Sequence, residues 1–100
     1  MISATIRRVD GRICGFVVED HGESKTCAAV SLLTLNTVNS IEALTDADFS
    51  YDYDPDGGFL RFEIAGADSG ADLLLEAMAL GLNSVKEEYS GEINITEELI

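Results

Sequence analysis

Two side chains in the first third of the chain have the chemistry of a cysteine hydrolase. His21 is the single histidine of the sequence, and Cys27 is one of its two cysteines. A short polar loop that contains Gly22 separates them. An imidazole can take the proton of a nearby thiol and later deliver it to a leaving amine. We therefore expect His21 to be the general base and Cys27 the nucleophile, provided that the loop folds the imidazole back over the thiol.

The position of Cys27 near the start of a predicted helix adds to this expectation. Backbone N–H groups without partners and the positive end of the helix dipole both favour a thiolate there. The same N–H groups can stabilise the oxyanion of a tetrahedral intermediate. However, a lone cysteine in an apolar helix is more often a small core residue. Residue type and spacing alone therefore leave the catalytic and the packing interpretations open.

The second cysteine, Cys14, lies in the middle of a predicted strand and is interpreted as a packing residue. A metal site built from Cys14, His21, Cys27 and a carboxylate is a weaker alternative, because the sequence has neither a Cys-x-x-Cys motif nor a histidine pair. Two cysteines cannot form the disulfide framework of a small secreted domain, and in a reducing compartment both should be thiols. We expect no cofactor and no metal, with a redox or metal-responsive role for the two cysteines as a minor alternative.

The elements that position these residues begin with a β-hairpin. Apolar and polar residues alternate over residues 2–7, Asp10-Gly11 is a strong hairpin-turn signal, and residues 13–19 form the returning strand. No charged residue occurs from 26 to 41, where apolar residues recur at helical spacing. A helix this apolar must be buried on more than one side, between the sheet and a second helix or at a subunit interface. Ser24 and Thr26 are candidates for its N-cap.

A second hairpin and a second helix follow. Aromatic residues alternate over 49–53, the turn is Pro55-Asp56-Gly57-Gly58, and residues 60–64 form the next strand. Ser69 and Asp72 have the spacing of a capping box at the start of a helix that runs to about Tyr89.

The chain after this helix completes the predicted fold. Gly91 is a plausible helix stop, and Ile93 and Ile95 belong to a short last strand. The element order is therefore ββαββαβ. It predicts a two-layer α+β fold, with two helices on one face of a mainly antiparallel sheet. A chain of 100 residues has room for one such domain, over residues 1–100.

Charge restricts the classes of partner. Acidic residues number 19 against 6 basic ones, which gives a formal charge of −13, and 46% of the residues are hydrophobic. This balance argues against direct nucleic-acid binding and against adhesion to an anionic membrane, and it favours a basic partner or simply solubility. No stretch approaches the ~20 apolar residues that span a bilayer. Because the first eight residues lack the apolar core of a signal peptide, we expect a cytoplasmic protein.

Four short motifs follow one another along the chain. They are Cys27-Ala28-Ala29-Val30-Ser31, Thr37-Val38-Asn39, Gly57-Gly58-Phe59-Leu60 and Leu80-Gly81-Leu82. Together they resemble the motifs of the ribosomal-processing cysteine proteases, the Prp family. The resemblance covers nearly the whole chain in the same order, and its most specific part is the pair of motifs that begins at the candidate nucleophile.

The resemblance implies a function. Members of this family are small homodimeric bacterial endopeptidases that remove a short N-terminal extension from a large-subunit ribosomal protein, cutting after an aromatic residue. Carried over by position, it implies that Cys27 is the nucleophile and His21 the base, and that no cofactor is used. A ribosomal protein precursor is a basic substrate, and the charge of −13 agrees with electrostatic attraction between the two.

The chain departs from the family pattern around the histidine. It has Asp20-His21-Gly22 where the family has Gly-His-Ala, and its loop before Cys27 is shorter. Ser24 stands where the family has an acidic residue. The alternative function is therefore a catalytically inactive dimeric paralogue that binds a basic peptide or a ribosomal protein.

Overall fold

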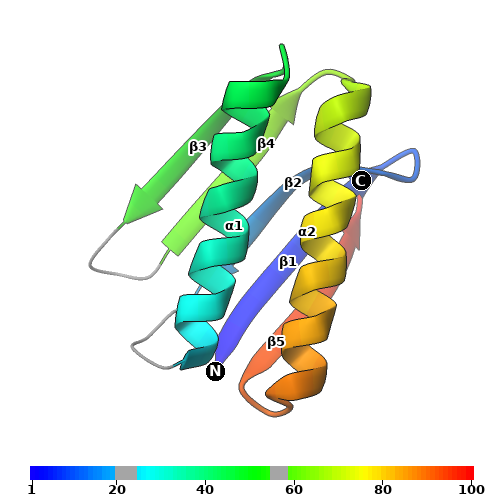
Figure 1. Ribbon diagram of the computed structural model, residues 1–100. Helices are drawn as coiled ribbons and strands as arrows, with labels where there is room; N and C mark the ends of the chain where they lie inside the picture. The colour runs from blue at the N-terminus through cyan, green and yellow to red at the C-terminus, as the bar shows by residue number, and fades with distance from the viewer. Residues whose placement is uncertain (20–24, 55–58) are drawn as a thin grey trace.

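Alternation of apolar and polar residues builds five strands, and two apolar stretches of helical periodicity build two helices. A computed structural model describes residues 1–19, 25–54 and 59–100. The predicted order ββαββαβ is confirmed (Figure 1). The elements are β1 (Ile2–Val9), β2 (Arg12–Glu19), α1 (Lys25–Leu44), β3 (Asp48–Asp54), β4 (Phe59–Ala65), α2 (Ser69–Glu88) and β5 (Ile93–Leu99).

The five strands form one mixed sheet. Their order is β3-β4-β2-β1-β5, so β3 and β5 are the edge strands. The pairs β1–β2, β2–β4 and β3–β4 are antiparallel, whereas β1 and β5 are parallel. The sheet is therefore mainly antiparallel, as predicted. The last strand is longer than expected, because Leu99 still pairs with Arg8 of β1.

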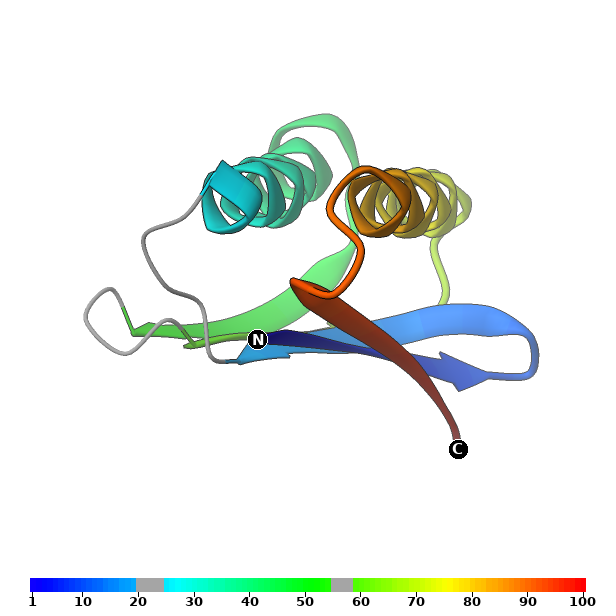
Figure 2. The same ribbon diagram turned by 90° about the horizontal axis from the view of Figure 1, so that it is seen from below.

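Both helices cover the same face of the sheet (Figure 2). Helix α1 carries the chain from β2 across β4 to β3, and α2 carries it from β4 across β2 and β1 to β5. The two crossovers move in opposite directions, and they start from strands that are themselves antiparallel. Two right-handed crossovers, the usual hand for such connections, then place their helices on one side. This topology explains the predicted two-layer α+β architecture.

The hydrophobic core lies between the sheet and the helices. Alternate residues of β1 point toward the helices and are buried, whereas the residues between them lie on the open face. Phe16 of β2 stacks on Phe62 of β4 with ring centroids 5.2 Å apart, and Phe49 of β3 contacts the same Phe62 ring at 5.2 Å. These aromatic rings continue the core from the central strands to the β3 edge.

Helix α1 is buried on two sides, by the sheet and by α2. Its buried stripe faces the sheet, and Leu33 packs beside Gly81 of α2. The hydroxyl of Thr37, a polar residue in this stripe, donates to the Leu33 carbonyl oxygen at 2.7 Å. Leu32 is 72% exposed and lies on the outward face. Of the two settings predicted for this helix, the structure shows the one between sheet and second helix.

The length of α1 corrects one expectation from the sequence. On length and composition alone, the 20 residues of Lys25–Leu44 suffice to cross a membrane, although no such stretch was predicted. A core helix passes the same test when one side of it is apolar enough to cover a sheet. The buried stripe of α1, which packs into the common core, has this role.

The start of α2 also differs from the prediction. Asp68, rather than Ser69, is the N-cap, and its carboxylate accepts a hydrogen bond from the Ala71 N–H at 2.9 Å. The predicted capping box of Ser69 and Asp72 is therefore wrong, because the preceding aspartate caps the helix one residue earlier. At the other end, Gly91 has a φ of +89°, which allows the sharp turn into β5.

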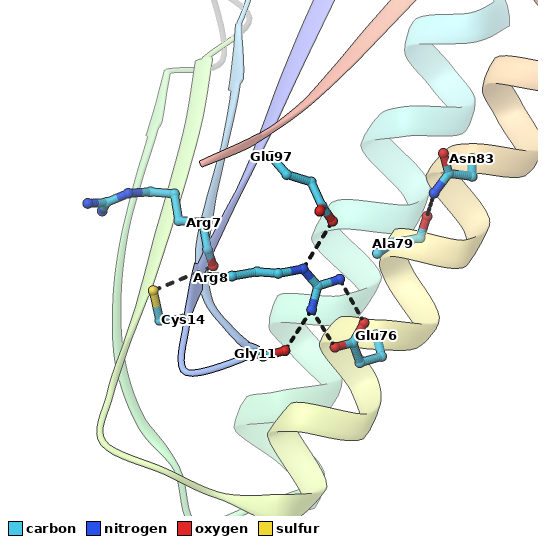
Figure 3. A network of polar contacts seen from close by, with 8 residues as sticks. All are labelled: Arg7, Arg8, Gly11, Cys14, Glu76, Ala79, Asn83 and Glu97. Carbon is cyan, nitrogen blue, oxygen red and sulfur yellow. Dashed lines mark hydrogen bonds and ion pairs between the residues drawn. The ribbon is translucent and has the colours of Figure 1, made fainter. Parts of the chain in front are cut away.

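Arg8 joins four parts of the fold at the far end of β1 (Figure 3). Its guanidinium donates to both carboxylate oxygens of Glu76 in α2, at 2.8 and 3.1 Å, and to Glu97 in β5 at 3.0 Å. It also donates to the carbonyl oxygen of Gly11 in the hairpin turn at 3.0 Å. The side chain of Arg8 is only 19% exposed, so this network is partly shielded from water.

Gly15 and Gly81, which have the closest packing contacts among the described glycines, should respond differently to alanine. A Cβ on Gly15 would lie 2.5 Å from the Phe62 carbonyl oxygen, which the sheet holds in place. A Cβ on Gly81 would lie 2.9 Å from a terminal methyl of Leu33, which can rotate away. We predict that Gly15→Ala lowers the free energy of unfolding by about 2 kcal/mol. Gly81→Ala should be nearly neutral, because alanine gains about 1 kcal/mol of helix propensity. Urea denaturation of both variants checks the prediction, and equal losses would contradict it.

The Arg8 network makes stability depend on pH. The hydrogen bond from Arg8 holds the pKa of Glu76 below its ordinary value of 4.5. Because the folded-state pKa is the lower one, the contribution is complete above 4.5 and is lost as the pH falls through the folded pKa. Glu76→Gln should lower the free energy of unfolding by about 1 kcal/mol at neutral pH, since the Glu76 side chain is 44% exposed and screened by water.

The difference between wild type and Glu76→Gln should therefore shrink progressively below pH 4.5, as measured by urea denaturation across pH. Glu88→Gln, at the exposed end of α2, is the matched control. A loss in Glu76→Gln that stays constant down to acid pH would show that the carboxylate charge is not the cause.

Candidate active site around Cys27

Cys27, the expected nucleophile, lies in the first turn of α1. Its exposed fraction is 4%, and it belongs to the hydrophobic core that the helices share with the sheet. A thiol at this position lies among the first backbone N–H groups of the helix, which have no partner within the helix. The structure confirms the predicted position near the start of a helix, and the thiolate stays a prediction. At 4% exposure, the side chain has little contact with solvent.

The first turn of α1 is tied to a distant part of the chain. The Thr26 hydroxyl donates to Oε1 of Glu92 at 3.0 Å, and Thr26 is 1% exposed. Glu92 lies in the turn between α2 and β5, 66 residues along the chain. Thr26 was predicted as a candidate N-cap, but it lies inside the helix and its hydroxyl donates to this carboxylate. Sequence reasoning missed Glu92, because no local pattern indicates a contact at this separation.

The turn that contains Glu92 is itself held by backbone hydrogen bonds. The Glu92 N–H donates to the Tyr89 carbonyl oxygen at 3.1 Å, and the Glu92 carbonyl oxygen accepts from the Ile2 N–H at 3.1 Å. Ile2 is also the residue that pairs with Ile93 at the start of the parallel β1–β5 ladder. The Glu92 side chain therefore extends toward α1 from a backbone position that the sheet and the end of α2 both fix.

The expected base, His21, lies outside the described residues, as does Ser24, the other candidate N-cap. The turn predicted at 55–58 lies outside them as well. The described elements on either side are β2, which ends at Glu19, and α1, which begins at Lys25. The structure thus places the candidate nucleophile, and the pairing of Cys27 with His21 stays a prediction.

Cys14 is separate from this site. It is the extra residue of a bulge in β2, where Arg7 pairs with Gly15 and Arg8 with Ile13. Its half-buried thiol lies 3.5 Å from the Arg7 carbonyl oxygen, to which it donates (Figure 3). Both cysteines are thiols. Within residues 1–19, 25–54 and 59–100, no group of three or more His, Cys, Asp and Glu side chains could hold a metal ion.

The edge of the sheet nearer to α1 than to α2 is formed by β3 and is rich in acidic and aromatic residues (Figure 1). In this strand, three aspartates and a serine alternate with aromatic residues. Tyr51 and Tyr53 are 48% and 52% exposed, whereas Phe49 packs against the core. Asp48 and Asp52 alternate with them on the opposite face of the strand. The exposed aromatic rings and the negative charge of this edge are suited to contact a peptide that carries basic and apolar residues.

Comparison with known proteins gives concordant matches. A model of the family described as cysteine protease Prp matches residues 1–94. The ribosomal processing cysteine protease Prp of Bacillus subtilis (strain 168) is 30% identical over 112 residues, which cover 100% of both chains. The protein of the same name from Staphylococcus aureus (strain Mu50) is 30% identical over 95 residues, covering 86% of this chain and 88% of that one.

A solved structure matches over the same extent. The crystal structure of the ribosomal processing protease Prp from S. aureus, in complex with a covalently linked product peptide, superposes with a TM-score of 0.92. The two chains are 27% identical, and the match covers 98% of this chain and 100% of the other. The similarity in fold and the similarity in sequence therefore point to the same family, each over nearly the whole chain.

Proposed function

Because the chain belongs to the Prp family of cysteine proteases, we propose that it is a cysteine endopeptidase that removes a short N-terminal extension from a large-subunit ribosomal protein. One observation carries this proposal. Cys27 occupies the first turn of α1 in a fold that superposes with a TM-score of 0.92 on a protease holding a covalently linked product peptide. A covalent link to peptide is the chemistry that a nucleophilic thiol provides.

The proposed reaction has two steps. The Cys27 sulfur adds to the scissile carbonyl carbon while His21 takes the thiol proton, and backbone N–H groups at the start of α1 stabilise the oxyanion. The imidazolium of His21 then protonates the leaving amine, and the C–N bond breaks to leave a thioester. Water, deprotonated by His21, adds to the thioester carbon, which releases the new carboxyl end and restores the thiol.

Charge and the β3 edge support a basic substrate. A ribosomal protein precursor carries many Lys and Arg residues, and a chain with a net charge of −13 attracts it at long range. The exposed rings of Tyr51 and Tyr53 suit the aromatic residue after which members of the family cut. We further propose that the protein acts in the cytoplasm as a homodimer, uses no cofactor and binds no nucleic acid directly.

The burial of Cys27 favours a second candidate function. A thiol that is 4% exposed must become more accessible before a peptide can reach it. The same fold could instead bind a basic peptide or ribosomal protein without cleaving it. Binding by this inactive paralogue would weaken strongly with salt and would survive Cys27→Ala and His21→Ala.

Cleavage of a peptide with the N-terminal extension of the ribosomal protein separates the two functions. We predict that Cys27→Ala abolishes turnover and that His21→Ala lowers kcat by about 10²–10⁴-fold, since each removes one partner of the proton transfer. Mass spectrometry of the products measures both effects. Cys14→Ala, which alters the other thiol, should leave the rate unchanged and is the matched control.

Cys27→Ala should remain folded, because alanine fits where the slightly larger thiol packs, and circular dichroism checks this point. The proposed function is wrong if the wild type leaves the peptide intact under conditions in which it binds it. Salt-dependent binding that persists in Cys27→Ala and His21→Ala would then favour the inactive paralogue, which binds a peptide without cleaving it.

A further inference from the structure

We infer that Thr26 and Glu92 form a clamp that positions the first turn of α1, and with it the thiol of Cys27, for catalysis. The inference rests on the proposed function, because it assigns two positioning residues to the same site. Neither residue was expected in this role from the sequence. The hydrogen bond between the Thr26 hydroxyl and Glu92 Oε1, 3.0 Å long, joins the residue directly before the nucleophile to the turn that precedes β5.

The burial of Thr26 makes this hydrogen bond energetically important. Thr26 is 1% exposed, and a buried hydroxyl without a partner is costly. Its partner is a carboxylate, and hydrogen bonds to ionised acceptors are stronger than those between neutral groups. The buried hydroxyl of Thr26 therefore has a charged partner, Glu92, which is itself exposed to water.

The carboxylate also supplies a charge that α1 lacks. No acidic residue lies in the first turn of Lys25–Leu44, whereas α2 has Asp72 in its first turn. Negative charge near the N-terminus of a helix stabilises the helix through its dipole. Glu92 brings such a charge to α1 from another element, where it holds the first turn in helical form.

The backbone on both sides of the clamp is fixed. Glu92 is anchored by hydrogen bonds of its N–H to Tyr89 and of its carbonyl oxygen to Ile2. Thr26 is followed at once by Cys27, which packs in the core. Hydrogen bonds therefore connect the β1–β5 ladder, through Glu92, to the residue next to the nucleophile. Small displacements of a reacting group cost large factors in rate, so this contact bears on catalysis as well as on folding.

Paired substitutions test the clamp. Thr26→Val and Glu92→Ala remove the hydrogen bond. Thr26→Ser keeps the donor and the charged acceptor, whereas Glu92→Gln keeps an acceptor but removes the charge. We expect the first two variants to lower kcat for peptide cleavage about tenfold or more, with KM changed less than about threefold. Thr26→Ser should stay within about threefold of wild type, and Glu92→Gln should fall between wild type and Glu92→Ala. The double variant Thr26→Val/Glu92→Ala should be no worse than either single one. Glu88→Ala, at the end of α2, is the control and should have no effect.

Amide hydrogen exchange of the same variants reports the clamp without reference to catalysis. The N–H groups of Ala29, Val30 and Ser31 bond to carbonyl groups in the first turn of α1. Their exchange should become at least about tenfold faster in Thr26→Val and Glu92→Ala and stay unchanged in Thr26→Ser. Glu92 is exposed, so Glu92→Ala decides the test even if Thr26→Val does not fold.

The outcomes separate the clamp from the proposed function. Faster exchange with unchanged kcat would show that the pair is only structural, and it would overturn the inference while the protease assignment stands. Unchanged exchange and unchanged kcat would also overturn it. If the wild type cleaves no peptide, the proposed function fails and the catalytic role of the clamp fails with it.

Discussion

The packing of one side of α1 on the sheet is the constraint on which the rest of the structure depends. The buried stripe of this helix covers the sheet, and its members in the first turn are Thr26 and Cys27. The position of the thiol is therefore fixed by the same contacts that hold the domain together. This arrangement gives a well-placed sulfur at the N-terminus of a helix, but one that is 4% exposed. The packing that fixes the position of the Cys27 sulfur therefore also limits the access of a substrate to it.

The sheet topology brings distant segments to the start of α1. Because β5 pairs in parallel with β1, the turn after α2 lies beside the first residue of β1, and Glu92 reaches Thr26 from there. At the opposite end of β1, Arg8 joins α2, β5 and the hairpin turn. The last strand is therefore anchored at both ends. The contacts of Arg8 join β5 to α2, and the contact of Glu92 joins the start of β5 to the candidate site.

Local sequence patterns predicted the strands and helices well. They could not predict contacts between residues that are far apart in the sequence. The alternation over 2–7 and the Asp10-Gly11 turn predicted the first hairpin, since strand period and turn chemistry are both local. The capping box at Ser69 was wrong, because two competing cap residues stand side by side and only the helix geometry chooses Asp68. The bulge at Cys14 was also missed, since its position depends on how two strands pair.

The candidate site was predicted in part. The position of Cys27 near the start of a helix was predicted from the apolar stretch after it. Its burial was left open, because an apolar stretch alone does not distinguish a packing cysteine from a nucleophile. The partnership of Thr26 with Glu92 could not be predicted, because it depends on the parallel pairing of the last strand. The contact of Cys27 with His21 stays a prediction, since His21 lies outside the described residues.

The rate of alkylation at Cys27 tests most directly whether its sulfur is ionised and reachable. Iodoacetamide at pH 7, with both cysteines resolved by peptide mass spectrometry, gives separate rate constants for Cys27 and Cys14. A catalytic thiolate predicts that Cys27 reacts faster than a free model thiol, despite its burial, and faster than the more exposed Cys14. A Cys27 that reacts no faster than the model thiol would contradict the account and leave only the fold in common with the proteases.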